Sequence, residues 1–439
     1  MWLRSIFISL WLTVKLAYAA PGLSLWQAWE LALANDPIYA AQRAQSQADQ
    51  EPINQARAHL LPTLEASAGL EHTSTRRAST LAHASHQSPN QWQLRLSQPL
   101  IDLAALSRLD RSRYLAAAAV LSQENAKNEL MLRVAHAYFE VLSTQDTLQA
   151  LKAQQQSVEH QLQAAQRSFE LGGATITDSL ESKARLDLIR AQRVQLEKDV
   201  LDKQNQLSRI IAQPVFELQT LGPQVQLSAP QPAVLDQWLE QARYNNLTVH
   251  QQQLQAQAQQ QQLQAQKREH APTVHLQARS GSQSNTGIYG PNQGPRALDN
   301  RIGIELSIPL YKGGEISSKV RESASLLQRS YYEAENARRQ AKESVQLHFN
   351  GVHSGLLEVH ALEAAERSSA ESVQANQKAY EIGVRINLDV LDAQQQLYQT
   401  QRDLAHARYT TLLHGLQLKQ AAGQLQESDL QQLSQLLDD

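Results

Sequence analysis

Two kinds of hydrophobic pattern alternate along this chain of 439 residues. Residues 64–72, 91–100, 273–282 and 301–310 alternate apolar and polar side chains with a period of two, which is typical of strands with one apolar face. Residues 130–169 and 345–380 place their core positions at alternating steps of four and three, which is the heptad rule of coiled coils. We therefore predict two strand pairs, each followed by a long helix and a returning helix with a weaker apolar seam. A helix from about residue 104 to 170 would be a rod of roughly 100 Å.

The chain carries an internal duplication. Three pairs of residues share an offset of 210 positions: Asn35 with Asn245, Pro62 with Pro272, and Pro99 with Pro309. Further along the offset becomes 211, as between Asp178 and Asp389. The sequence thus predicts a first repeat at 20–212, a proline-rich linker at 213–233, a second repeat at 234–425 and a C-terminal tail at 426–439.

Each repeat has the same predicted order of elements. A helical segment comes first, at 25–59 and at 234–270, and the first copy is interrupted near Asn35, Asp36 and Pro37. A strand pair follows, at 64–100 and 273–310, and then a helical hairpin whose tip falls at 170–178 or 381–389. Four strands per chain are too few to close a barrel, because about eight are needed.

The N-terminus and the composition limit the possible cellular compartment and the possible classes of partner. Residues 1–19 are predicted to be a cleaved signal peptide, because an apolar run follows Arg4 and ends at Ala17-Tyr18-Ala19. The exported chain has no cysteine, so it uses no disulfide. A formal charge of -3 provides no basic field, which argues against nucleic acid as a partner.

No motif for catalysis, a cofactor or a metal is found. The chain lacks cysteine, G-x-S-x-G, a phosphate loop and H-E-x-x-H, so we predict that it is not an enzyme and has no cofactor. The links at 73–90 and 281–300 are rich in Ser, Asn, Gly and Pro and are predicted to be exposed outer loops. His72, His83 and His86 lie at the first of them, where solvated histidines are a better explanation than a metal site.

The chain resembles the TolC family of outer-membrane efflux proteins. The resemblance rests on VAHAYFEVL at 134–142, ITDSLESKARL at 176–186 and the run DVLDAQQQLYQTQRDLAHARY at 389–409, within the duplicated architecture. It implies an α+β membrane protein of the outer membrane, in which a homotrimer builds a twelve-stranded β-barrel continued by a twelve-helix periplasmic α-barrel. The implied function is a channel-tunnel for proteins or small toxic compounds. Its implied partners are a periplasmic adaptor (a membrane fusion protein), an inner-membrane ABC or proton-driven transporter, and outer-membrane lipid.

The two hairpin tips are the candidate functional site. Asp389 and Asp392 are three residues apart, on one face of a helix start whose dipole favours negative charge. The resemblance places both inward, as a cation-selective pore constriction; the alternative is helix capping by Asp389 with Asn387. The resemblance also implies gating links by Thr177, Asp178, Tyr380 and Arg385.

The resemblance further implies that an adaptor docks on the tips. The residues concerned are Leu171, Gly172, Gly173, Ile382, Gly383 and Val384. Gly173 departs from the family pattern, in which a larger apolar residue usually follows the first glycine; this leaves the identity of the adaptor open. Both glycines also suit a left-handed turn.

A structural rival to the channel is a secreted trimeric coiled-coil stalk or adhesin without a duct. It predicts one rod per chain and no duplicated strand pairs. Within the channel hypothesis, nothing in the sequence chooses between protein secretion and drug efflux.

Overall fold

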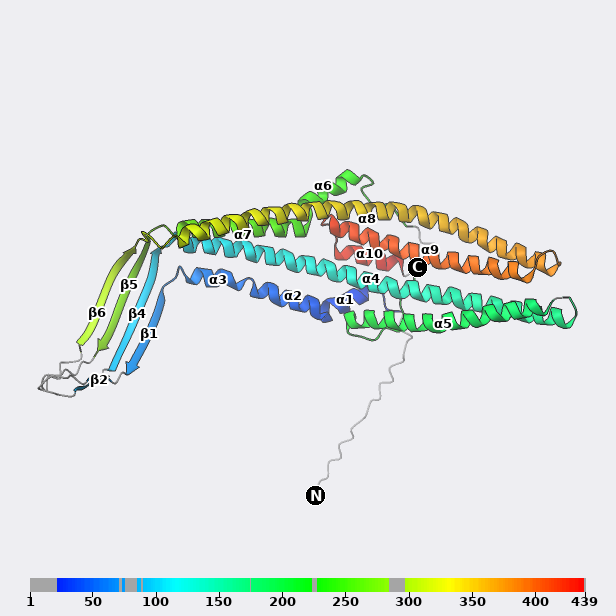
Figure 1. The fold of residues 1–439 in the computed structure, drawn as a ribbon, viewed down its shortest axis with the longest axis horizontal. Helices are drawn as coiled ribbons and strands as arrows, with labels where there is room; N and C mark the ends of the chain where they lie inside the picture. Colours follow the sequence, from blue (N-terminus) through cyan, green and yellow to red (C-terminus); the bar gives the residue numbers. More distant parts are fainter. Residues whose placement is uncertain are drawn as a thin grey trace, which may run out of the picture.

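The computed structural model describes residues 22–70, 73–75, 85–87, 90–173, 175–222, 227–283 and 297–437. These residues form an elongated molecule with a small antiparallel sheet at one end and long helices over the rest of its length (Figure 1). The prediction of a mostly helical chain with a small sheet is confirmed. The predicted signal peptide at 1–19 lies outside the described residues.

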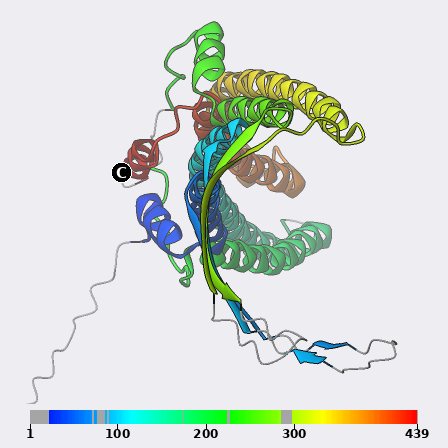
Figure 2. The same cartoon turned by 90° about the vertical axis from the view of Figure 1, so that its left-hand side faces the viewer.

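The sheet brings the two halves of the chain together. Its strands are β1 (Thr63–Leu70), β4 (Asn90–Ile101), β5 (Thr273–Gln283) and β6 (Ala297–Ser307), in the order β1-β4-β5-β6. All neighbours are antiparallel, and the central β4–β5 pair joins the first half to the second. The four strands curve together when seen from the sheet end (Figure 2). Two short paired strands, β2 (Thr73–Thr75) and β3 (Ser85–Gln87), lie within the segment predicted to be an outer loop.

The last strand is shifted from its predicted position at 301–310. β5 begins at Thr273, directly after Pro272, and Thr273 pairs with Ser307, so the ladder ends there. Pro309 has no N–H to extend it. The first half differs, because a register shift between Pro99 and Ile101 lets β4 continue past its proline.

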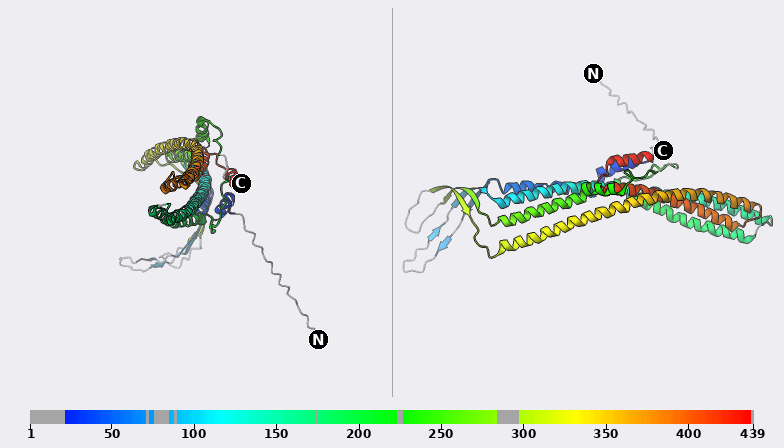
Figure 3. Two further views of the ribbon diagram at one scale, coloured as in Figure 1. Left: turned by 90° about the vertical axis from the view of Figure 1, so that its right-hand side faces the viewer. Right: turned by 90° about the horizontal axis from the view of Figure 1, so that it is seen from above.

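Two helices run the whole length of the rod. α4 (Leu103–Glu170) has 68 residues and α8 (Glu315–Glu381) has 67, which corresponds to about 100 Å each. From the tips, α5 (Ile176–Ile211) and α9 (Asn387–Ala421) return only part of the way. The sheet half of the rod is completed by α2 (Pro37–Ala48), α3 (Glu51–Ala58) and α7 (Leu247–Arg268) (Figure 3).

Buried polar caps break the first helical segment of each half. α1 (Leu25–Asn35) ends where the Asp36 carboxylate accepts a hydrogen bond from Tyr39 N at 2.7 Å. α6 (Leu235–Asn245) ends at Asn246, whose Oδ1 accepts from Val249 N at 3.0 Å. The sequence predicted the first break but not the second. Pro37 marks the first, whereas Leu247 stands at the equivalent position in the second copy.

The largest apolar core lies at the middle of the rod and involves both ends of the chain. Trp29 of α1 and Leu430 of α10 (Glu427–Leu436) pack there against Tyr138 and Leu142 of α4 and Leu207 of α5. Part of the predicted C-terminal tail is therefore a packed helix. Among the described residues, no helix is long and apolar enough to cross a membrane.

Candidate functional site

The two hairpin tips lie together at the end of the rod remote from the sheet (Figure 1). At each tip the long helix ends in a glycine with a left-handed backbone, Gly172 at φ +76° and Gly383 at φ +77°. Gly173 follows the first, and a side chain built there would meet only the Ser168 carbonyl. Leu171 is 87 % exposed and Ile382 is 75 % exposed, so both tips present apolar side chains to solvent.

The two returning helices begin with unequal caps. Thr175 and Asp178 form a reciprocal capping box: Thr175 N donates to Asp178 Oδ2 at 2.9 Å, and Asp178 N donates to Thr175 Oγ1 at 3.4 Å. At the second tip the cap residue is Ile386, which has no side-chain acceptor. Asp389 Oδ2 accepts from Ile386 N at 3.4 Å, so the capping contact that was the alternative explanation for Asp389 is present.

The predicted gating residues are only partly brought together. The Tyr380 side chain is partly buried near Asp178; this burial, and secondly the Asp178 charge, raise the pKa of the phenol. Arg385 instead forms an ion pair with Asp389 at 3.5 Å. Among the described residues, Arg385 makes no hydrogen bond to Thr177 or Asp178. The gating roles of these four residues remain predictions.

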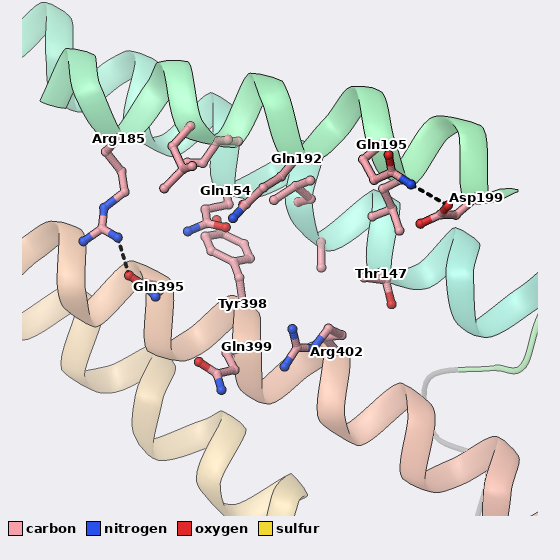
Figure 4. A pocket seen from close by; sticks show the side chains of 15 residues that line it. Thr147, Gln154, Arg185, Gln192, Gln195, Asp199, Gln395, Tyr398, Gln399 and Arg402 are labelled. Carbon is pink, nitrogen blue, oxygen red and sulfur yellow. Dashed lines mark hydrogen bonds between the residues drawn. The ribbon is translucent and has the colours of Figure 1, made fainter.

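Asp392 has a partner that the sequence reasoning missed. Arg185 of α5 donates from Nη2 to Asp392 Oδ1 at 2.9 Å and also binds Gln395 (Figure 4). The Arg185 and Gln395 side chains line one end of a groove of about 370 Å³ between the first hairpin and α9. Across the groove, the Ser157 and Tyr398 hydroxyls are 3.0 Å apart. A basic residue about three turns beyond the first tip was the signal that could have suggested Arg185.

Asn387 was considered only as a helix cap, but it has a different environment. It is the first residue of α9, and its side chain is fully buried against the first hairpin, where it hydrogen-bonds Gln161 and Ser182. Neither partner was singled out from the sequence. Both occupy small or polar positions beside the apolar seam, where a heptad pattern provides no signal.

The described residues contain no cluster that could hold a metal. No group of three or more His, Asp or Glu side chains with suitable geometry occurs among them. Of the three loop histidines, His86 belongs to β3, while His72 and His83 lie outside the described residues.

Known proteins share both the sequence pattern and this architecture. The family model described as "Outer membrane efflux protein" matches residues 28–213 and 238–424. The chain is 29% identical over 435 residues to the proteases secretion protein PrtF of Dickeya chrysanthemi, covering 96% of this chain and 94% of that one. It is 30% identical over 440 residues to the alkaline protease secretion protein AprF of Pseudomonas aeruginosa, covering 98% and 89%. It is 28% identical over 423 residues to the outer membrane protein TolC of Salmonella enteritidis, covering 94% and 84%.

A solved structure agrees in fold. The outer membrane protein VceC of Vibrio cholerae superposes with a TM-score of 0.78 at 18% identity, covering 91% of this chain and 96% of that one. The chain therefore belongs to the outer membrane efflux protein family, and the family resemblance predicted from the sequence is confirmed. It is an outer-membrane channel of an efflux or secretion system. Nothing supports a stalk without a duct, since one chain holds two hairpins and two strand pairs.

Proposed function

We propose that three copies of this chain form one channel, with a twelve-stranded β-barrel continued by a twelve-helix periplasmic α-barrel. The observation that carries this proposal is the open sheet. In the described sheet, β1 and β6 each pair on one side only. Leu64, Ile302 and Ile304 expose 72%, 77% and 70% of their surface on it. Unpaired edges are not tolerated in lipid, and pairing β1 of one copy with β6 of the next removes every edge.

The tips would form the periplasmic entrance and its gate. Asp389 and Asp392 from three chains would make two stacked acidic rings that favour cations. Thr177, Asp178, Tyr380 and Arg385 would link neighbouring hairpins and hold the entrance shut. Both ion pairs seen at the tip are accessible to solvent, with side-chain exposures of 57% and 35% for Arg385 and Asp389 and of 24% and 59% for Arg185 and Asp392. Exposed pairs are worth about 0–1 kcal/mol each, so they can be exchanged during opening at low cost.

The exposed apolar residues at the tips suit a docking partner. Leu171, Ile382 and Val384 would be covered by a periplasmic adaptor, with Gly172, Gly173 and Gly383 allowing close approach of its backbone. The adaptor would connect the channel to an inner-membrane transporter, either an ABC exporter or a proton-driven pump. The signal peptide at 1–19 would be removed on export to the outer membrane.

The cargo that we propose is a polypeptide, such as an exported protease, passed on by an ABC exporter. The support is the similarity to PrtF and AprF over nearly the whole chain, because both names describe protease secretion. Efflux of small toxic compounds is the second candidate, which the family description favours.

An export assay tests the proposal. A Gram-negative host that carries a secreted protease with its ABC transporter and adaptor, but lacks an outer-membrane channel, receives this chain. We expect extracellular protease activity to appear, and the double variant Leu171→Asp with Ile382→Asp to abolish it without loss of protein from the outer membrane. Absence of extracellular protease despite normal outer-membrane levels would argue for the small-molecule alternative, which drug-accumulation measurements in the same strain would then examine.

A further inference from the structure

A buried amide links the two hairpins beside their tips. Asn387 is 0% exposed, although it begins a helix that starts at an exposed tip. Its Nδ2 donates to the Asp178 main-chain carbonyl at 3.0 Å and to Ser182 Oγ at 2.8 Å. Its Oδ1 accepts a hydrogen bond from Gln161 Nε2 at 2.7 Å. The donors and the acceptor of the carboxamide are thus all used. One side chain of the second hairpin joins both helices of the first.

An apolar contact continues this junction one turn further along α9. Leu391 follows Asn387 by four residues, so both side chains project from the same helix face. Leu391 is buried in a cluster with Val158 of α4 and with Leu186 and Ile189 of α5. The first two turns of α9 therefore insert an amide and a leucine into the seam of the first hairpin.

The buried hydrogen bonds of Asn387 should cost more free energy to break than the solvent-accessible ion pairs at the tips. The Arg385–Asp389 and Arg185–Asp392 pairs are open to water, which solvates the charges when the pairs break. Gln161 and Ser182 are buried, with exposures of 6% and 0%. If the second tip moves away, polar groups in this junction lose their partners before water can replace them, and that desolvation penalty opposes the movement.

We propose that Asn387, with Gln161 and Ser182, is a latch that seats the second tip on the first hairpin, and that the gate leaves this position only when the buried bonds break. Asn387 is a positioning residue, since it holds the helix that carries Asp389 and Asp392. This inference rests on the proposed gating function of the tips. It assigns most of the free energy that opposes opening to a buried junction within each chain, in addition to the links at the surface.

Distance measurements between the tips test the latch directly. The chain has no cysteine. Leu171→Cys and Ile382→Cys therefore place two spin labels at exposed tip positions, and dilution with unlabelled chain confines the pairs to one subunit. We expect one narrow distance distribution in the otherwise unchanged protein. Asn387→Leu should add a second distribution, with the unseated fraction raised about fivefold or more. Asn376→Ala is the control, because within the described part of the chain the Asn376 amide hydrogen-bonds to Ser372 of its own helix and not to the other hairpin.

A second set of variants separates a latch from a general folding defect. Ser182→Ala removes one bond and should unseat a smaller fraction of tips. Combining Gln161→Leu with Asn387→Leu removes both facing amides, and the seated fraction should partly recover, because a matched apolar pair leaves neither amide unsatisfied. Identical distance distributions for the unchanged protein and Asn387→Leu would overturn the latch. These distances do not depend on transport, so a chain that forms no conducting channel would defeat the proposed function and still leave the latch to be decided.

Discussion

The two acidic residues at the second tip have basic partners at very different distances along the chain. Their spacing of three residues places Asp389 and Asp392 on one helix face, and this follows from the sequence alone. The Arg385 partner of Asp389 is four residues away and could also be anticipated. The Arg185 partner of Asp392 is 207 positions away in the chain and depends on how two hairpins pack. Local spacing carries no information on that contact, and the same applies to Gln161 and Asn387.

Removal of both carboxylates should abolish the cation preference that we propose for the channel. In Asp389→Asn with Asp392→Asn, Arg385 and Arg185 remain but lose their carboxylate partners, so the charge at the tips becomes more positive. We expect the cation-to-anion permeability ratio, obtained from reversal potentials in a salt gradient, to fall to about 1 or below. Asp403→Asn, which alters an exposed carboxylate further along α9, should keep the original ratio. A double variant that stayed cation-selective would remove these residues from the constriction.

At the scale of elements, periodic patterns predicted the helices and strands themselves, but not the element ends that depend on pairing or capping. The sequence predicted a helix from about residue 104 to 170, with heptad positions at 130–169, and α4 covers Leu103–Glu170. The position of β6 was wrong by about four residues at its start, because its ends are set by the pairing with β5. The break at Asn246 was missed because no proline marks it, although its side chain makes the same cap as Asp36.

The second hairpin contains a histidine pair that should make it sensitive to acid. His348 Nδ1 of α8 and His414 Nδ1 of α9 are 3.1 Å apart, and Gly351 leaves room for the His414 ring. Burial, and secondly His414, lower the pKa of His348 from 6.5 to about 4. The folded protein thus favours the neutral ring. The resulting stability is fully present above pH 6.5 and is lost as the pH falls towards 4.

We expect His348→Gln to reduce this loss of stability between pH 6.5 and 4. The effect should be on the order of 1 kcal/mol, because the half-buried site is partly screened by water. The midpoint of thermal unfolding in detergent, followed by circular dichroism from pH 7 to 4, measures it. His353→Gln changes an exposed histidine of the same helix and should leave the pH profile as it is. Equal acid sensitivity of His348→Gln and the unchanged protein would exclude the pair as the cause.

The sheet should tolerate charge on one face and not on the other. Ile304 lies on the exposed apolar face of β6, whereas Gly303 points to the opposite face, where an added Cβ meets nothing within 4 Å. If the apolar face contacts lipid, Ile304→Arg should destabilise the folded protein in vesicles by about 2–4 kcal/mol near the bilayer centre. Gly303→Arg should have a much smaller effect. Urea titration of both variants in lipid vesicles measures the difference, and equal effects would contradict a lipid-facing role.

At the scale of the whole molecule, one chain alone does not form a closed channel. The described four-stranded sheet has two unpaired edges, and the tips expose apolar side chains, so we propose that assembly with further copies completes the channel. Native mass spectrometry of the detergent-extracted protein should give a mass close to three times that of one chain, which is 49.0 kDa before removal of the signal peptide. A stable monomer or dimer would require another way of pairing β1 and β6.

The central claim is that the two tips form the closable entrance of an outer-membrane channel. Single-channel recording in planar lipid bilayers tests it most directly, on the unchanged protein and on Arg385→Ser. The account predicts small, stable, cation-selective currents for the unchanged protein. It predicts a closed-state conductance several-fold larger for Arg385→Ser, because the link that we propose between Arg385 and a neighbouring hairpin would be lost. An Arg367→Ser control, in an exposed part of α8 away from the tip, should behave as the unchanged protein. Folded protein that conducts no ions, or an Arg385→Ser current equal to that of the unchanged protein, would contradict the account.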